Sequence, residues 1–154
     1  MGLLLVVNLH GTINSSAPVR KALTELKVER RFSASVVTDD PATVGMLKLC
    51  KDRVAWTPTD ADLLATLLKK RGMVSETVRL DAHALAAMGF KKHEELAGKM
   101  LKEELRLSQV KGLRPFFKLA PPKGGFRLSL RRQFSEKGML GSNPNLSELV
   151  RRMA

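Results

Sequence analysis

Clusters of lysine and arginine are the side chains of this sequence whose type and spacing point to a chemical task. The first group consists of Arg20, Lys21, Lys27, Arg30 and Arg31. The second group consists of Lys111, Arg114, Lys118, Lys123, Arg127, Arg131 and Arg132. Guanidinium and ammonium groups neutralise phosphate oxygens, so the expected task is to bind a polyanion.

The distribution of charge favours the second group as the main contact. The net charge is +12, and residues 111–154 contribute ten basic and two acidic side chains, or eight of these twelve charges. Residues 1–80 carry a net +4, and residues 81–110 are neutral. This asymmetry indicates a nucleic acid or an anionic membrane surface as partner, and a basic surface that is only solvated is the plain alternative.

The second group is interleaved with residues that shape the backbone. Pro121-Pro122 fixes φ and removes two backbone donors, whereas Gly124-Gly125 lets the backbone come close to another molecule. Gly124 and Gly125 are therefore candidate contact residues together with the cations around them. They do not form a nucleotide-binding phosphate loop, because the required spacing and the following Lys-Ser/Thr are missing.

Catalysis and metal binding have weaker support in the sequence. His10, His83 and His93 do not have metal-ligand spacing. The pair Asp39-Asp40 could act as two carboxylates, but the proline that follows predicts a helix cap instead. Cys50 lies on the apolar side of its predicted helix, so we expect it in the core. The sequence predicts no enzyme, no cofactor and no bound metal.

The first 72 residues predict an α+β core. Strands are expected at residues 3–9, 32–37 and 54–56, and helices are expected to begin after Ser16, at Pro41 and after Asp60. The continuous apolar run of the first strand predicts that both of its faces are covered. The connections imply a small sheet with its helices packed on one face. Gly72 is expected to end the third helix and this core.

Residues 73–154 predict an extension of helices and a basic loop. The expected elements are helices at Ala82–Met88 and His93–Leu107, a packed strand at Leu113–Leu119, a segment from Pro121 to Arg132 that leaves the protein to reach its partner, and a short helix capped by Asn145. Phe116 or Phe117 is expected to anchor the strand. The predicted division is therefore a core at 1–72 and an extension at 73–154.

Aromatic residues are scarce, with six Phe, one Trp and no Tyr. Trp56 and Phe117 could stack on bases, but both have apolar neighbours and are expected in the core. A sheet that reads single-stranded RNA needs exposed aromatics on its strands, so folded RNA bound through phosphates and shape is preferred. One cysteine suits a reducing cytoplasm, and the apolar start is too short for a signal peptide or a membrane span.

Several stretches, taken together, resemble a known family. They are Gly11–Asn14, Pro18–Lys21, Val54–Trp56, Leu68–Gly72, Phe116–Leu119, Pro122–Gly125 and Leu149–Met153. In order and spacing they are similar to the archaeal form of large-subunit ribosomal protein thirty, whose eukaryotic counterpart is protein seven, over essentially the whole chain. The resemblance implies a ferredoxin-like core bound to large-subunit ribosomal RNA, with an added helical and basic-loop extension. The basic arm that precedes the first strand in the eukaryotic type is missing here.

The leading hypothesis is a structural constituent of the large (50S) subunit of cytoplasmic ribosomes that clamps ribosomal RNA without catalysis. Neighbouring ribosomal proteins are the other expected partners, and no membrane or small-molecule substrate is expected. The candidate RNA-binding residues are Asn14, Arg20, Lys21, Arg30, Arg31, Lys118, Lys123, Gly124, Gly125, Arg127, Arg131 and Arg132. A free-standing RNA-binding or RNA-chaperone module and a small α+β enzyme for an anionic substrate remain as alternatives.

Overall fold

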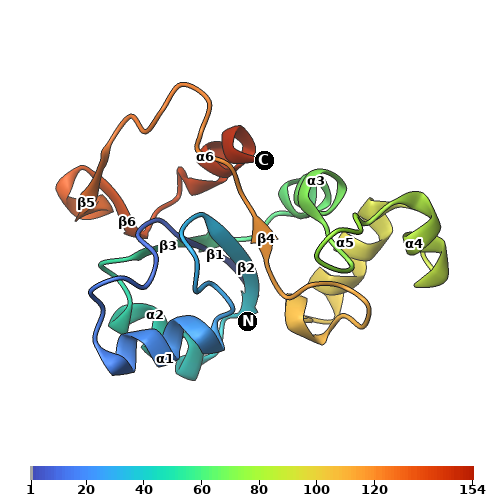
Figure 1. Ribbon diagram of the computed structural model, residues 1–154, viewed down its shortest axis with the longest axis horizontal. Coiled ribbons are helices and arrows are strands. Elements are labelled where there is room, and N and C mark those ends of the chain that lie inside the picture. Colours follow the sequence, from blue (N-terminus) through green and yellow to red (C-terminus); the bar gives the residue numbers. More distant parts are fainter. Residues whose placement is uncertain (1) are drawn as a thin grey trace.

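A six-stranded mixed sheet organises the chain, of which this computed structural model describes residues 2–154 (Figure 1). The strands are β1 (Leu3–Asn8), β2 (Ser33–Thr38), β3 (Val54–Pro58), β4 (Phe117–Lys118), β5 (Ser129–Gln133) and β6 (Gly138–Ser142). Their order across the sheet is β4-β2-β1-β3-β6-β5. β1 runs antiparallel to both of its neighbours, and β6 is parallel to β3 and to β5.

The α-helices are α1 (Ala17–Glu25), α2 (Pro41–Leu49), α3 (Ala61–Arg71), α4 (Ala82–Ala87), α5 (His93–Lys102) and α6 (Leu146–Met153). Short 3₁₀ turns follow α5 at Leu107–Gln109 (η1) and β5 at Phe134–Glu136 (η2). We call residues 73–112, which include α4, α5 and η1, the helical appendage. The predicted α+β class with a ferredoxin-like core is confirmed.

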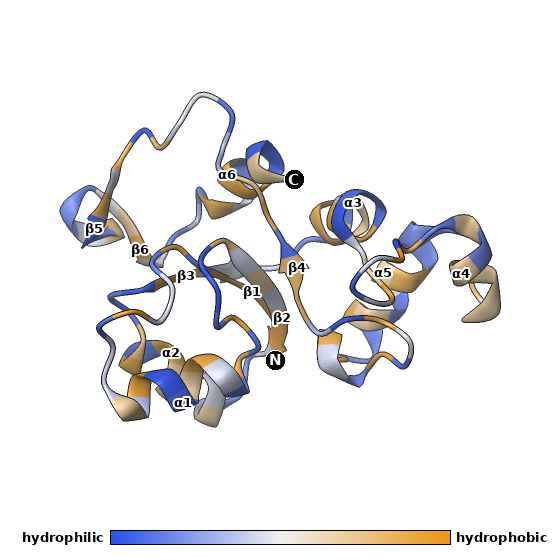
Figure 2. Ribbon diagram, in the orientation of Figure 1, coloured by the Kyte–Doolittle hydropathy of each residue, from blue (hydrophilic) through white to orange (hydrophobic). Residues whose placement is uncertain are grey.

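The two faces of β1 belong to two different hydrophobic clusters. Leu4 and Val6 pack with the apolar sides of α1 and α2, whereas Leu3, Leu5 and Val7 pack with α3, α5 and α6. The expectation that the helices lie on one face of the sheet is therefore wrong, because α3 covers the face opposite to α1 and α2. A strand with apolar side chains on both faces requires cover on both. Figure 2 shows the apolar strands enclosed between these helices.

The helix boundaries follow local chemistry. α2 begins at Pro41, which needs no backbone donor at the first helical position, and α3 ends before Gly72. Asp62 lies in the first turn of α3, and three basic residues lie in its last turn, both favourable with the helix dipole. Asp40 occupies the predicted capping position, but its carboxylate makes no capping hydrogen bond.

The extension adds three strands to the sheet of the core. The predicted strand at 113–119 shortens to β4, where Phe117 is the anchor with 1% of its surface exposed. The strands β5 and β6 were not predicted. Gly138 permits their close pairing, since a Cβ at this position would lie 1.9 Å from the carbonyl oxygen of Arg132. The helix predicted to reach residue 107 ends at Lys102. The short final helix is confirmed as α6.

Candidate nucleic-acid interface

Buried Asn8 organises the loops at the end of β1. Its Nδ2 donates to the carbonyl of Val28 at 2.7 Å, and its Oδ1 accepts from the backbone N–H groups of His10 at 3.0 Å and Gly11 at 2.7 Å. The side chain is thus satisfied although it is fully buried. These bonds fix the loop after β1 beside the loop after α1, and the two loops surround the first basic group.

Two arginines hold the loop between β1 and α1. The guanidinium of Arg53 donates to the carbonyl of Gly11 at 3.2 Å and to that of Asn14 at 2.9 Å. The guanidinium of Arg20 donates twice to the carbonyl of Ser15, at 3.1 and 3.3 Å. Asn14 has φ of 57°, a left-handed conformation that asparagine tolerates. Asn14 is thus presented on a fixed loop, whereas Arg20 is partly engaged within the protein.

An aromatic stack joins the first basic group to the second. The guanidinium of Arg31 lies 4.7 Å from the ring centre of Phe32 and donates to the carbonyl of Leu9 at 3.0 Å. On Phe32 stacks Phe126, with ring centres 6.0 Å apart and planes 24° apart. The N–H of Leu119 donates to the carbonyl of Phe32 at 2.9 Å. The segment that carries the second group is therefore attached to the loop that carries Arg30 and Arg31.

The Pro/Gly-rich segment has a defined shape. Gly124 and Gly125 have φ of +80° and +73°, which side-chain-bearing residues rarely adopt. The N–H of Gly125 donates to the carbonyl of Pro122 at 3.0 Å, which closes a turn. Arg152 of α6 then donates to the carbonyls of Lys123 at 3.2 Å and Gly125 at 3.1 Å. Both glycines are exposed, and a Cβ on Gly125 would meet nothing within 4 Å.

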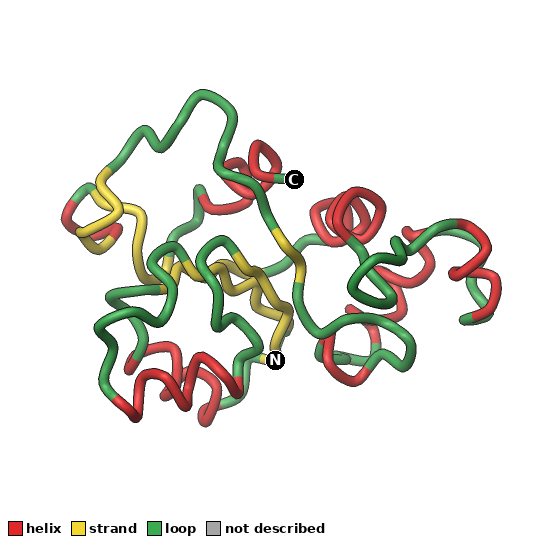
Figure 3. Tube along the Cα trace, viewed as in Figure 1, coloured by secondary structure: helices red, strands yellow, loops and turns green. Residues whose placement is uncertain are grey.

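The segment from Pro121 to Arg132 is attached to the protein at Pro122 and Phe126, while nine of its twelve residues are exposed. That it reaches a partner stays a prediction. Figure 3 shows it as a long loop that passes α6 on its way from β4 to β5. Pro122 is buried, Phe126 is half-buried, and the last residues are part of β5. Apolar burial and the Arg152 contacts hold the loop down while its cations stay outside. We call the loops 9–16, 26–32 and 119–128 together the basic sheet end.

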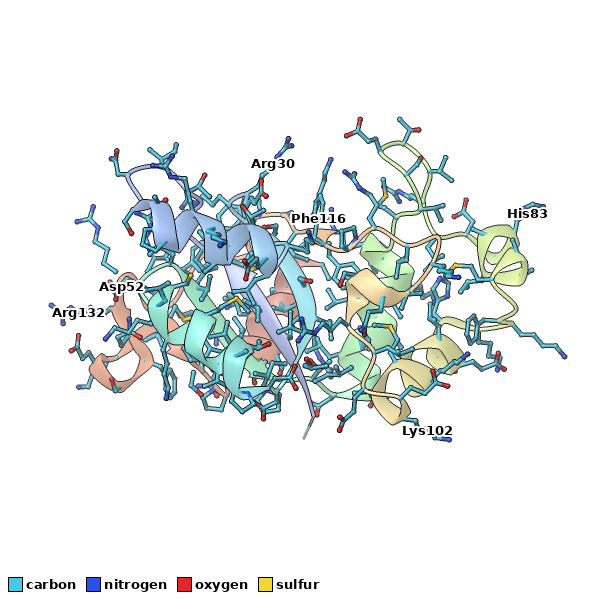
Figure 4. The ribbon with its side chains drawn as sticks, turned by 90° about the horizontal axis from the view of Figure 1, so that it is seen from below. Arg30, Asp52, His83, Lys102, Phe116 and Arg132 are labelled. Carbon is cyan, nitrogen blue, oxygen red and sulfur yellow. The ribbon has the colours of Figure 1, made fainter. Side chains whose placement is uncertain are left out.

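The structure separates the candidate residues into two places. Exposed side chains are those of Asn14, Arg20, Lys21, Arg30, Arg31, Lys118, Lys123, Arg127, Arg131 and Arg132. Lys118, on β4, pairs with Ser33 close to Arg30, whereas Arg131 and Arg132 lie on β5 at the other edge of the sheet. Figure 4 shows Arg132 pointing outward, well away from Arg30. Charges on edge strands also discourage pairing with strands of other molecules, and Lys118 and Arg132 are placed to do this.

Several side chains that shape the basic loops were not predicted from the sequence. Asn8 follows a run of apolar strand residues, and a polar residue at such a position is a signal of a buried hydrogen-bond hub. Phe32 was treated as a strand residue, yet it has φ of 61° and lies in the aromatic stack. Arg53 and Arg152 were assigned no role from the sequence, and nothing in their spacing indicates that they bind loop carbonyls. Arg127 also has an acidic neighbour, with Glu148 at 3.9 Å.

Two ionisable groups outside the interface have shifted pKa values. The hydroxyl of Thr38 donates to the carboxylate of Asp40, and Arg106 of the helical appendage donates to the same oxygen at 2.6 Å. These hydrogen bonds, that from Thr38 first, hold the pKa of Asp40 below its ordinary value. Burial raises the pKa of the Cys50 thiol to about 11, with Arg53 acting in the opposite direction. Cys50 lies in the core, as predicted.

Residues 2–154 contain no group of three or more His, Cys, Asp or Glu side chains arranged to hold a metal ion. In the same part of the chain, every helix is too short or too polar to cross a bilayer. The half-buried Trp56 packs against the cluster of α1 and α2, as expected for a core aromatic.

The fold and its basic loops define an α+β protein with a ferredoxin-like core and a cationic end. No protein-family model matches the chain. It is 36% identical over 155 residues to large ribosomal subunit protein uL30 of Thermofilum pendens, which covers 99% of both chains. The protein of the same name from Cenarchaeum symbiosum is 34% identical over 99% of this chain and 98% of its own. The protein of the same name from Nitrosopumilus maritimus is 33% identical over 97% of this chain and 96% of its own. The chain belongs to the uL30 family.

Proposed function

We propose that the protein is a structural constituent of the large ribosomal subunit and binds ribosomal RNA through the basic sheet end. Its relatives are named as large-subunit ribosomal proteins, and the chain matches them over nearly their whole length. This likeness supports assembly into the large subunit in the cytoplasm. The relatives are named as ribosomal proteins and not as enzymes, so the hypothesis of catalysis is set aside.

The junction at Phe32 and Phe126 carries the proposal, because it unites two cationic loops that are distant in sequence. Exposed cations on both sides of the junction can contact phosphates, while Asn8, Arg53 and Arg152 hold the backbone that bears them. A surface whose loops are fixed before binding loses less conformational freedom when it meets RNA. The protein thus clamps folded RNA by charge and shape, without chemistry.

Within this proposal the two parts of the chain have different tasks. Residues 1–72 supply the sheet and the first basic group, and residues 73–154 supply the second group and the helical appendage. Exposed Gly124 and Gly125 let the backbone approach RNA closely, because no side chain stands between them and a phosphate. Asn14 offers an amide to the sugar-phosphate backbone from the neighbouring loop.

The assembly proposal is tested by gradient sedimentation of cell extract at low salt. The protein is expected in the fractions of the large subunit, and removal of the RNA by nuclease should release it. Recovery at the top of the gradient in untreated extract would instead favour the second hypothesis, a free-standing RNA-binding module. The same gradient in high salt serves as a control, since contacts with phosphates weaken as salt rises.

A further inference from the structure

A small cleft lies between the loop that precedes β2 and the segment that precedes β4. Lys27, Glu29 and Arg30 form one wall, and Arg114, Pro115 and Phe116 form the other. Figure 4 shows Arg30 and Phe116 on the same side of the molecule. The cavity has a volume of about 250 Å³. It is smaller than the roughly 300–1,000 Å³ of typical small-molecule pockets.

The wall at Arg114–Phe116 is held firmly by the sheet. The N–H of Arg114 donates to the carbonyl of Met73 at 2.8 Å, and the hydroxyl of Ser35 donates to the carbonyl of Pro115 at 2.8 Å. The next residue, Phe117, pairs with β2 and is buried. The cleft is therefore formed in the free protein.

The side chains of this wall are suited to a planar, electron-rich ligand. The guanidinium of Arg114 lies 4.7 Å from the ring centre of Phe116. Its Nη1 is buried and makes no hydrogen bond with any of residues 2–154, and its Nη2 meets only the exposed Glu76, at 3.7 Å. Unstacked RNA bases stack on aromatic rings and on guanidinium planes, and this wall presents both.

The opposite wall supplies charge for a phosphate. Lys27 and Arg30 are exposed cations, and Glu29 is the one acid of the cleft. A carboxylate can accept from the amino group of a base, as glutamate does with cytosine. The two walls thus offer separate places for the base and for the phosphate of a single nucleotide.

We propose that this cleft takes one unpaired nucleotide of the bound RNA, such as a bulged base. The base lies against Arg114 and Phe116, and its phosphate meets Lys27 and Arg30. The inference rests on the proposed function and adds a site to it, since Phe116 was expected only as an anchor of the strand and Arg114 only as one cation of the second basic group. A peptide is a poorer occupant, because the cleft is small and presents three cations.

The test uses an RNA hairpin with a single bulged adenosine and the same hairpin without the bulge. The full-length protein is expected to bind the bulged hairpin about tenfold more tightly, a gain typical of one stacked base. Arg114→Ala and Phe116→Leu should abolish this preference. Phe116→Leu should leave the affinity for the unbulged hairpin nearly unchanged, whereas Arg114→Ala also removes a cation of the second basic group and should weaken both hairpins slightly. Arg114→Lys keeps the charge but lacks the planar fork, so it should also lose the preference.

Arg132→Ala is the matched control, since it removes a cation distant from the cleft and should weaken both hairpins alike. Thermal unfolding of each variant shows whether the fold is retained. Equal affinity of the unaltered protein for the two hairpins would overturn the inference and leave the proposed function standing. A preference that survives in folded Arg114→Ala and Phe116→Leu would overturn it as well. Failure to bind either hairpin would count against the proposed function itself.

Discussion

The basic sheet end and the helical appendage are held together by opposite means. In the appendage, apolar side chains of α4, α5 and the following turn surround a cavity of about 590 Å³, and residues 81–110 carry no net charge. At the sheet end, Asn8, Arg53 and Arg152 bind the carbonyls and N–H groups of exposed loops. Loops cannot bury enough apolar surface to be fixed by packing alone, so at the sheet end hydrogen bonds supplement the stack of Phe32 and Phe126.

The difference shows that a count of basic residues overstates the charge available to a partner. The guanidinium groups of Arg20, Arg31, Arg53 and Arg152 donate to backbone carbonyls of the protein. The remaining exposed cations of the sheet end, apart from Arg127 beside Glu148, are available to meet phosphates. A structural arginine and a binding arginine look alike in the sequence, and only the fold separates them.

The largest loss of RNA affinity is expected from neutralising exposed cations of the second basic group. Replacing Lys118, Lys123, Arg127, Arg131 and Arg132 by Gln should lower the affinity for a large-subunit ribosomal RNA transcript by roughly a hundredfold or more and flatten its salt dependence by about 0.9 per lost phosphate contact. Filter binding between about 50 and 200 mM salt measures both quantities, because the affinity of a protein with several phosphate contacts falls by orders of magnitude across this range.

Two control variants sharpen this comparison. Replacing Arg79, Lys91, Lys92, Lys99 and Lys102 of the appendage by Gln removes the same formal charge and should change binding little. The double variant Arg20→Gln and Lys21→Gln should have an intermediate effect, since Arg20 is already engaged with Ser15. Equal losses from these five cations of the second basic group and from the five of the appendage would show that total charge, and not its place, governs binding.

A smaller effect is expected from Asn8→Ala. It deprives one carbonyl and two N–H groups of their partner in a buried place, which should lower the free energy of unfolding by about 2–4 kcal/mol. Urea denaturation measures the change. Asn145 is exposed and its side chain makes no capping hydrogen bond at the start of α6, so Asn145→Ala should change stability by less than about 0.5 kcal/mol. If Asn8→Ala were as stable as the unaltered protein, the hydrogen bonds of Asn8 would not be what fixes these loops.

The smallest effect concerns the link between the appendage and the core, where Arg106 meets Asp40. The folded pKa of Asp40 is lowered, so its contribution to stability is present above the unfolded pKa and is lost as pH falls through the folded pKa. We expect stability to decline below about pH 4 more steeply in the unaltered protein than in Asp40→Asn. Thermal unfolding from pH 6 to pH 2.5 provides the comparison, and parallel curves would contradict it.

The core was predictable because its signals are local. Apolar periodicity and Pro41, Asp60 and Gly72 indicate the strands and helices that the structure contains. The strand β5 was not predictable, since its Ser-Leu-Arg-Arg-Gln sequence is polar and exposed and pairs through the close approach at Gly138. The placement of α3 was predictable in principle, because the two-sided apolar run of β1 already required it.

The candidate site was predictable in composition and not in arrangement. Positive charge beside Pro and Gly identified the loop at 121–127, but its attachment to Phe32 depends on contacts across more than ninety residues of sequence. A pattern in one segment carries no information about a partner so far along the chain. The contacts of Arg53 and Arg152 are of the same long-range kind.

The attachment of the basic loop to α6 has a consequence for synthesis. The N–H of Ala120 donates to the carbonyl of Met153, and Arg152 binds the turn at Lys123. Because chains are made from the N-terminus, the sheet of β1, β2 and β3 can assemble while the loop still lacks its anchor. The surface proposed to meet RNA therefore reaches its final form only after residue 153 has been added, and a shorter nascent chain is expected to bind RNA weakly.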